Sequence, residues 1–363
     1  MVIQIADKKI GQNHPCFIIA EASSNHGNDL QRAKKLIEAA AKSGADAVKF
    51  QLFTASQIAA DTCDPRTIVR ADEKAVFVDQ DTKLIDLYRP NELPRQWLPD
   101  LAAYAKSQGI LFMATPFDEE AVDQLEAVDA PAYKNGSYEL LDVPLLRKMA
   151  KTQKPVILST GMATLGDIES AIEIVKAAGN DQVILLHCTS TYPTPFEDVN
   201  LRAMMTMRRA HPSYPIGLSD HTLGISVAIG SAALEACVIE KHLMLDDGVS
   251  TIDDKFSLSP REFKAMVDGI RQVEKALGSY QKEPTHREEK EKLQARRSLW
   301  VTQDVKAGES FTKENIGVLR PGTGLSPLHY DLVMSSQARC DLKATKALEW
   351  DDINPQGPRA HPL

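Results

Sequence analysis

The feature of this sequence that most constrains its fold is a series of short apolar runs, each ending in polar residues or glycine. Eight such runs recur along most of the chain. They begin at Cys16, Ala47, Ile110, Ala132, Val156, Val183, Pro215 and Cys237. Near-continuous apolar runs of this length are typical of parallel strands that are covered on both faces of the sheet.

Amphipathic helical patterns lie between these runs. In segments 30–44, 165–179 and 261–278 apolar residues recur at helical spacing, and the patterns end at Gly44, Gly179 and Gly278. Eight strand–helix units in about 280 residues match the usual size of a TIM barrel. We therefore predict an α/β fold with a (β/α)8 TIM barrel over residues 1–280. A doubly wound open sheet stays an alternative, because alternation alone does not prove closure.

Two parts of the chain depart from this alternation. The interval between residues 51 and 110 is long, and we expect a loop there with one helix near residues 97–107. Segment 281–296 is charged and nearly free of apolar residues, which predicts a linker or a solvated helix. Residues 297–353 show short strand patterns broken by glycine and proline, which predicts a small β-rich domain. Residues 354–363 are expected to be a disordered tail.

Composition and charge exclude several classes of protein. The formal net charge of −8 argues against a general nucleic-acid surface, so an anionic substrate would need a local basic pocket. The chain has no apolar run of roughly 18 residues and no apolar run at its start. Its five cysteines are scattered and include no CxxC pair. We expect a cytoplasmic protein without a nucleic-acid or membrane partner.

Polar residues concentrate where the predicted strands end, which is where TIM barrels carry their catalytic groups. Lys49 and Lys134 lie inside apolar strands, and a buried ammonium group needs an anion to offset its desolvation. Each nearby hydroxyl is by itself most simply an ordinary strand-end residue. Together with the lysines, the hydroxyls of Thr115, Ser137 and Ser159 suit a carboxylate and a phosphate.

His221 and His242 are at the ends of consecutive predicted strands. A lone histidine there is usually a hydrogen-bonded core residue, but two of them can meet at one divalent ion, with Asp220 or Glu240 as their supporting partners. Such a site would leave coordination positions for water and substrate, as Lewis-acid chemistry requires.

Several segments resemble the sialic acid synthase family, in that family's order. They are IIAEASSNHG, ADAVKFQ, ATPF, AYKNGS, VILSTGM, HCTSTYPTPFEDVNL, IGLSDHTLG and VIEKHLMLD. The C-terminal RSLWVTQDVKAGESFTKENIGVLRPGTG is similar to that family's antifreeze-like (SAF) domain. The resemblance runs from residue 18 to residue 352. It implies a TIM barrel followed by an SAF domain, and condensation of phosphoenolpyruvate with N-acetylmannosamine or a related sugar, with release of phosphate.

The resemblance also implies roles for individual residues. Phosphoenolpyruvate would be held by Lys49, Thr115, Lys134, Ser137, Ser159 and Ser219. His221 and His242 would bind a divalent metal, Mn2+ or Mg2+, and Glu21 would be the essential acid of the first strand. The sugar would face Ser190 and Tyr192, and also Arg320 from the small domain of the other subunit. A domain-swapped homodimer is therefore implied.

The sugar itself is less well defined, because the branches of this family make N-acetylneuraminic, legionaminic or pseudaminic acid. The segments DDKFSLSPREFKAMVDGIRQVEKALG, RRSLWV and RPGTGLSP resemble the pseudaminic branch, whereas HCTSTYPTPFEDVNL and KFQ suit the other two. Ser190 stands where N-acetylneuraminate synthases often carry asparagine. We favour a di-acetamido sugar and the pseudaminic branch. A metal-dependent aldolase and a non-catalytic carbohydrate-binding protein are alternatives from other classes.

Overall fold

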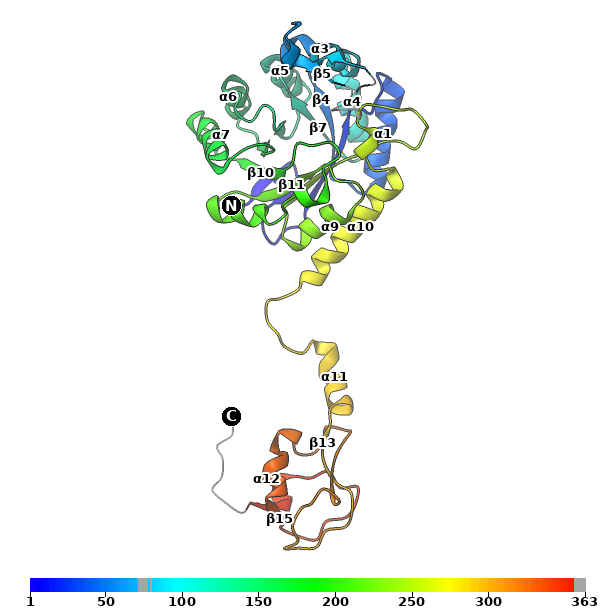
Figure 1. The fold of residues 1–363 in the computed structure, drawn as a ribbon, viewed down its shortest axis with the longest axis vertical. Helices are drawn as coiled ribbons and strands as arrows, with labels where there is room; N and C mark the ends of the chain where they lie inside the picture. Colours follow the sequence, from blue (N-terminus) through cyan, green and yellow to red (C-terminus); the bar gives the residue numbers. More distant parts are fainter. Residues whose placement is uncertain (71–77, 79, 356–363) are drawn as a thin grey trace. The chain divides into compact units, whose positions relative to one another are not determined.

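The computed structural model describes residues 1–70, 78 and 80–355. The chain divides between Gly278 and Ser279 into two compact units, two residues before the predicted boundary at 280, and each unit is described by itself (Figure 1). Of the tail predicted for 354–363, residues 356–363 lie outside the described residues, while Asn354 and Pro355 belong to strand β16.

The first unit is built on a sheet of eight parallel strands, and each predicted run forms one of them. They are β3 (Phe17–Ser23), β4 (Ala47–Leu52), β7 (Leu111–Pro116), β8 (Tyr133–Asn135), β9 (Val156–Ser159), β10 (Val183–Cys188), β11 (Ile216–Asp220) and β12 (Val238–His242). Their order is β7-β4-β3-β12-β11-β10-β9-β8. Strands β7 and β8, at the two ends of this order, contact each other, so the sheet closes as a TIM-like barrel and the open-sheet alternative is wrong.

Helices cover the outside of the strands (Figure 1). They are α1 (Leu30–Ser43), α4 (Leu98–Ser107), α5 (Glu119–Ala127), α6 (Val143–Lys151), α7 (Leu165–Ala177), α8 (Ala203–Ala210), α9 (Ser226–Ala233) and α10 (Pro260–Leu277). Local chemistry sets their ends. Asp29 caps the first turn of α1, and Gly44 ends that helix with a positive φ of 84°. Ser259 and Glu262 form a capping box at the start of α10.

A hairpin of β1 (Ile3–Ile5) and β2 (Lys8–Ile10) was not expected, because each strand is only three residues long. Its isoleucines share a buried cluster with residues at the beginnings of the barrel strands, such as Phe17 and Ala47. The hairpin therefore packs at the N-terminal end of the barrel. The site residues lie at the other end.

The long interval before α4 contains more structure than the predicted loop and single helix. It holds α2 (Ala55–Ile58), β5 (Ile68–Val69), β6 (Thr82–Lys83) and α3 (Leu84–Tyr88). Single 3-10 turns occur in both units: η1 (Pro65–Thr67), η2 (Arg89–Asn91), η3 (Arg95–Trp97), η4 (Phe196–Asp198), η5 (Asp254–Phe256), η6 (Pro327–His329) and η7 (Trp350–Asp352). Within the described part of the chain, no helix has the length and apolar character needed to span a membrane.

The second unit is small and has its own core. It contains α11 (His286–Ala295), β13 (Ser298–Val301), β14 (Ile316–Leu319), α12 (Tyr330–Met334), β15 (Ser336–Ala338) and β16 (Ile353–Pro355). Antiparallel pairs join β13 to β14 and β15 to β16 around buried residues such as Leu299 and Val333. Helix α11 occupies most of segment 281–296 and buries none of its residues, as expected of a solvated helix.

A buried ion pair joins β11 to β12 next to the site. Asp220 and Lys241 are opposite each other in the parallel ladder, and Lys241 Nζ lies 2.8 Å from Asp220 Oδ2. The second oxygen of Asp220 accepts a hydrogen bond of 2.9 Å from the backbone N–H of Thr222. Lys241 is fully buried, and its Nζ also donates to the carbonyl oxygen of Thr222. Among the described residues, Asp220 is the one carboxylate within ion-pair distance of it.

We predict that Lys241→Met lowers the free energy of unfolding by about 3–5 kcal/mol, because it leaves Asp220 buried without its partner. The double variant Asp220→Asn/Lys241→Met removes both charges and should lose clearly less. Guanidinium unfolding curves measure both values. Equal losses in the single and double variants would contradict the prediction.

Candidate active site

The predicted site residues of the barrel converge at its C-terminal end. Side chains alternate along a strand, so residues two apart in a strand point the same way. On β12 this alternation turns Glu240 and His242 toward the site and Lys241 toward Asp220. The inward-facing set is nearly completely buried: Glu21, Lys49, Thr115, Lys134, Ser159, Ser219, Glu240 and His242.

Lys49 on β4 connects three neighbouring strands. Its Nζ forms an ion pair with Glu21, lies 3.7 Å from Glu240 Oε1 and donates a hydrogen bond of 2.9 Å to Thr115 Oγ1. Only 3% of its surface is exposed. Ser219 Oγ donates to the same oxygen of Glu240 at 3.3 Å. Both carboxylates and the ammonium group therefore belong to one buried network.

Lys134 on β8 has a different environment. Its Nζ donates to Ser159 Oγ at 2.7 Å and to the carbonyl oxygen of Asn135 at 2.8 Å. No carboxylate of the described residues lies within ion-pair distance of it. Burial lowers the pKa of Lys134. An ammonium group held by neutral partners in a buried pocket has an unmet demand for an anion.

The two buried carboxyl groups have opposite pKa shifts. Burial raises the pKa of Glu21 to about 7, although Lys49 opposes the shift. Burial acts in the same direction on Glu240, but Lys134 and Lys49 together outweigh it and lower the pKa of that carboxyl. Glu240 is therefore ionised at neutral pH, whereas Glu21 can exchange a proton there. Carboxyl groups separated in this way suit different roles in proton transfer.

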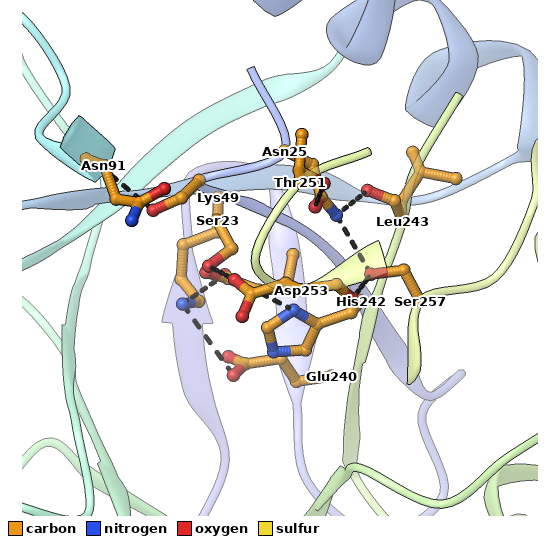
Figure 2. A network of polar contacts seen from close by, with 12 residues as sticks. Ser23, Asn25, Lys49, Asn91, Glu240, His242, Leu243, Thr251, Asp253 and Ser257 are labelled. Carbon is orange, nitrogen blue, oxygen red and sulfur yellow. Dashed lines mark hydrogen bonds and ion pairs between the residues drawn. The ribbon is translucent and has the colours of Figure 1, made fainter. Parts of the chain in front are cut away.

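The two histidines face each other, with ring centroids 5.4 Å apart. His221 Nδ1 lies 3.1 Å from the carbonyl oxygen of Thr189, a contact that leaves its Nε2 free for another partner. His242 Nδ1 is buried without a hydrogen-bond partner and lies 3.8 Å from Asp253 Oδ2 (Figure 2). Burial lowers the pKa of His242 well below its usual value, so the ring is neutral.

Neither Asp220 nor Glu240, the predicted supporting partners, forms a hydrogen bond or ion pair with His221 or His242 among the described residues. Asp220 points away from the site to Lys241, and Glu240 contacts Lys49 and Ser219. The carboxylate beside His242 is Asp253, in the loop that follows β12. The sequence offers several acidic residues in that loop, and spacing alone does not indicate which one turns inward.

These residues fit a divalent metal ion held by two histidines. A neutral imidazole is the form that binds metals, and burial keeps the ring of His242 neutral. Nδ1 of His221 faces the Thr189 carbonyl oxygen and Nδ1 of His242 faces Asp253, so the Nε2 atoms of the two rings would hold the ion. Across the described ranges, no group of three or more His, Cys, Asp or Glu side chains is arranged to hold a metal ion. A metal at His221 and His242 would therefore take its remaining ligands from water or substrate.

The residues expected to face the sugar differ in their surroundings. Tyr192 packs against His221, with ring centroids 4.5 Å apart. Ser190 Oγ is buried without a hydrogen-bond partner. Near it lies the backbone of Gly161, whose N–H donates a hydrogen bond of 3.0 Å to Ser137 Oγ, a residue predicted to bind phosphoenolpyruvate. Arg320 belongs to the second unit, where its Nε donates to the carbonyl oxygen of Ala295 at 2.6 Å.

Comparison with known proteins gives this site a context. Residues 36–282 match the NeuB family and residues 296–354 match the SAF domain. The chain is 42% identical to the N,N'-diacetyllegionaminic acid synthase of Campylobacter jejuni, over 90% of this chain and 97% of that one. It is 39% identical to the pseudaminic acid synthase of the same organism, over 96% and 97% of the two chains.

A solved structure agrees with these sequence matches. The N-acetylneuraminic acid synthetase of Leptospira borgpetersenii, in complex with citrate, has a TM-score of 0.71 and 33% identity, and the match covers 80% of this chain and 95% of that one. Fold and site thus define a TIM-barrel enzyme with a C-terminal SAF domain. The chain belongs to the NeuB family.

We predict that the Glu21 carboxyl titrates near pH 7 and that Lys49→Met raises its pKa further, because Lys49 is the main group that lowers it. Carbon-13 NMR of labelled glutamate carboxyls measures the midpoint, with Glu21→Gln identifying the signal. A midpoint near pH 4 in the wild-type chain would contradict the structure of this network.

Proposed function

We propose that this enzyme condenses phosphoenolpyruvate with the aldehyde of an N-acetylated amino sugar and releases phosphate, forming a nonulosonic acid. The observation that carries the proposal is the buried ammonium group of Lys134, which has only neutral partners. A second buried ammonium group and two facing histidines lie in the same barrel end. The named synthases to which the chain is similar support the same class of reaction.

Phosphoenolpyruvate suits the cationic side of the site. It carries a carboxylate and a phosphate, which match two ammonium groups surrounded by hydroxyl donors. Lys134 donates a hydrogen bond to the hydroxyl of Ser159, and Lys49 donates one to the hydroxyl of Thr115. Each lysine therefore already holds one hydroxyl group in place. Ser137 and Ser219 complete the proposed set. In this proposal the anion supplies the negative charge that Lys134 lacks in the free protein.

The reaction forms one carbon–carbon bond and breaks one carbon–oxygen bond. The C3 carbon of phosphoenolpyruvate attacks the sugar aldehyde carbon, whose oxygen takes up a proton, and C2 becomes electron-poor. Water adds to C2 and loses a proton, and the tetrahedral intermediate then expels phosphate through C–O cleavage. A divalent ion at His221 and His242 would supply Lewis-acid polarisation of the aldehyde.

Glu21 is the side chain best suited to move a proton during this reaction. Its pKa of about 7 lets it hold or release a proton at neutral pH, and its ion pair with Lys49 fixes its position. Glu240, on β12 and 3.7 Å from Lys49 Nζ, stays ionised, and its charge stabilises positive character that develops at C2.

For the acceptor we propose a di-acetamido hexose, with the pseudaminic branch preferred. Ser190 and Tyr192 are proposed to face this sugar. Relatives named for legionaminic and for pseudaminic acid are similar to the chain at 42% and 39% identity, so the choice between these sugars rests on direct assay.

We further propose that the enzyme is a homodimer in which the SAF domain of one chain covers the barrel of the other and presents Arg320. Exposed apolar side chains on the loops that follow β8 to β12 support this: Tyr138, Leu141, Met162, Phe196, Leu223 and Val249. The second unit also exposes Leu319, Leu328 and Trp350. Several exposed apolar side chains at the end of the barrel that carries the site would gain from being covered by a partner.

With Mn2+ present, we predict phosphate release from phosphoenolpyruvate in the presence of one of three acceptors, N-acetylmannosamine or either of two di-acetamido hexoses. EDTA and His242→Ala should each lower the rate at least a hundredfold, because both remove the Lewis acid. His211→Ala, which truncates a buried histidine at the end of helix α8, in contact with Glu169, is the matched control and should keep activity.

Two other outcomes of this assay would each indicate a different class of protein. Carbon–carbon bond formation without phosphate release would favour an aldolase. Sugar binding without turnover by the folded chain would favour a carbohydrate-binding protein. Either result overturns the synthase proposal.

The proposed dimer predicts complementation between two inactive variants. Glu21→Gln damages the barrel site and Arg320→Ala damages the covering domain, so each homodimer should be nearly inactive. A mixed dimer would contain one intact site, made of the barrel of one chain and the Arg320 of the other. Activity that appears after the variants are unfolded and refolded together supports domain swapping. Two inactive variants that stay inactive in proven mixed dimers would exclude it.

A further inference from the structure

The side chain of Asn25 uses all of its hydrogen-bonding groups on one loop. The loop, residues 243–257, follows β12 and carries Asp253. Asn25 Nδ2 donates to the carbonyl oxygen of Leu243 at 2.9 Å and to Ser257 Oγ at 2.9 Å, and its Oδ1 accepts from Thr251 Oγ1 at 2.5 Å (Figure 2). Asn25 is completely buried. One amide therefore binds the beginning, the middle and the end of this loop.

Asp253 is held from two sides, by Ser257 of the loop and by Ser23 at the end of β3. Ser257 Oγ, which receives a hydrogen bond from Asn25, donates one of 2.6 Å to the carbonyl oxygen of Asp253. Ser23 Oγ donates to the Asp253 carboxylate (Figure 2). A continuous chain of contacts thus leads from Asn25 through Ser257 to Asp253, and from there to His242, 3.8 Å away.

The backbone at the end of β3 has an unusual conformation at Ser23, the residue that contacts Asp253. The ladder between β3 and β4 shifts register between Glu21 and Ser23. Ser23 has a φ of +46°, in the left-handed region that a residue other than glycine seldom adopts. Such a conformation in a buried residue is retained where the surroundings require it, often at functional sites. Here it accompanies the hydroxyl that reaches Asp253.

We infer that Asn25 is a positioning residue, which holds loop 243–257 closed on the barrel so that Asp253 stays beside His242. A carboxylate next to a metal-binding histidine orients the ring and raises its affinity for the metal. The inference rests on the proposed metal site at His221 and His242. Asn25 itself touches neither histidine in any contact of the described structure, so its effect has to pass through the loop.

The isosteric change Asn25→Asp tests this most directly. It replaces the two donors to Leu243 and Ser257 by an acceptor while keeping the size of the side chain. We expect faster hydrogen–deuterium exchange in residues 244–257 and a loss of about tenfold in Mn2+ affinity, measured by electron paramagnetic resonance. Affinity for phosphoenolpyruvate without metal, measured by calorimetry, should stay within twofold because Lys134 and Lys49 lie outside this chain of contacts.

Two further variants make the test specific. Thr251→Val removes one of the three contacts and should change the loop and Mn2+ affinity in the same direction, by less. Asn180→Asp is the matched control. Asn180 is also a buried asparagine and lies just before β10, and its Nδ2 donates a hydrogen bond of 2.8 Å to the carbonyl oxygen of Lys154. It should leave loop exchange and Mn2+ affinity unchanged.

Unchanged exchange of the loop in Asn25→Asp would overturn the inference. So would equal losses of Mn2+ and phosphoenolpyruvate affinity, since they would indicate general damage to the barrel. A wild-type chain that binds no Mn2+ would overturn the proposed metal site instead, and loop exchange would then still decide whether Asn25 holds the loop.

Discussion

Burying two ammonium groups at one end of an apolar barrel is the constraint on which the rest of this site depends. Lys49 meets it with two carboxylates from the same flank of the barrel, Glu21 on the neighbouring strand β3 and Glu240 on β12, the strand beyond it. Lys134 donates its hydrogen bonds to a hydroxyl and a carbonyl oxygen, and among the described residues no carboxylate lies within ion-pair distance of it, although its charge acts on Glu240 from farther away. Lys134 is therefore a buried cation without such a carboxylate among the described residues, in a chain whose net charge is −8. An anionic substrate can therefore be attracted to this pocket although the whole protein does not attract it.

Strand alternation lets the same strands build both the site and its support. On β11 and β12, the inward-facing residues contribute to the charge network and the facing histidines. The residues between them, Asp220 and Lys241, form an ion pair that links the two strands just below the histidines. The Asp220–Lys241 ion pair therefore supports the strands, while the neighbouring network of Lys49 and Glu240 faces the site. A register shift of one residue would turn the supporting pair into the site and the site residues out of it.

Much of the fold could be predicted from the sequence, because strands covered on both faces leave a clear apolar pattern. All eight barrel strands were found in this way, and Gly44 ends α1 as expected. The β1–β2 hairpin and the small elements between β4 and α4 were not found, since segments of two or three residues carry no periodicity. The lysines and hydroxyls of the site were predicted for the same reason that the strands were: polar residues stand out where apolar runs end.

The sequence by itself determined the set of barrel strands and the polar residues at their ends. Its motifs also determined the assignment to the NeuB family. Tertiary structure alone decided which carboxylate lies beside which lysine or histidine. Asp220 was expected beside a histidine and binds Lys241, while Asp253 reaches His242 from a loop that Asn25 holds in place. The physical reason is that side-chain direction within a strand follows from register, but the path of a loop follows from hydrogen bonds to residues more than 200 positions away along the chain. Those bonds leave no local pattern in the sequence.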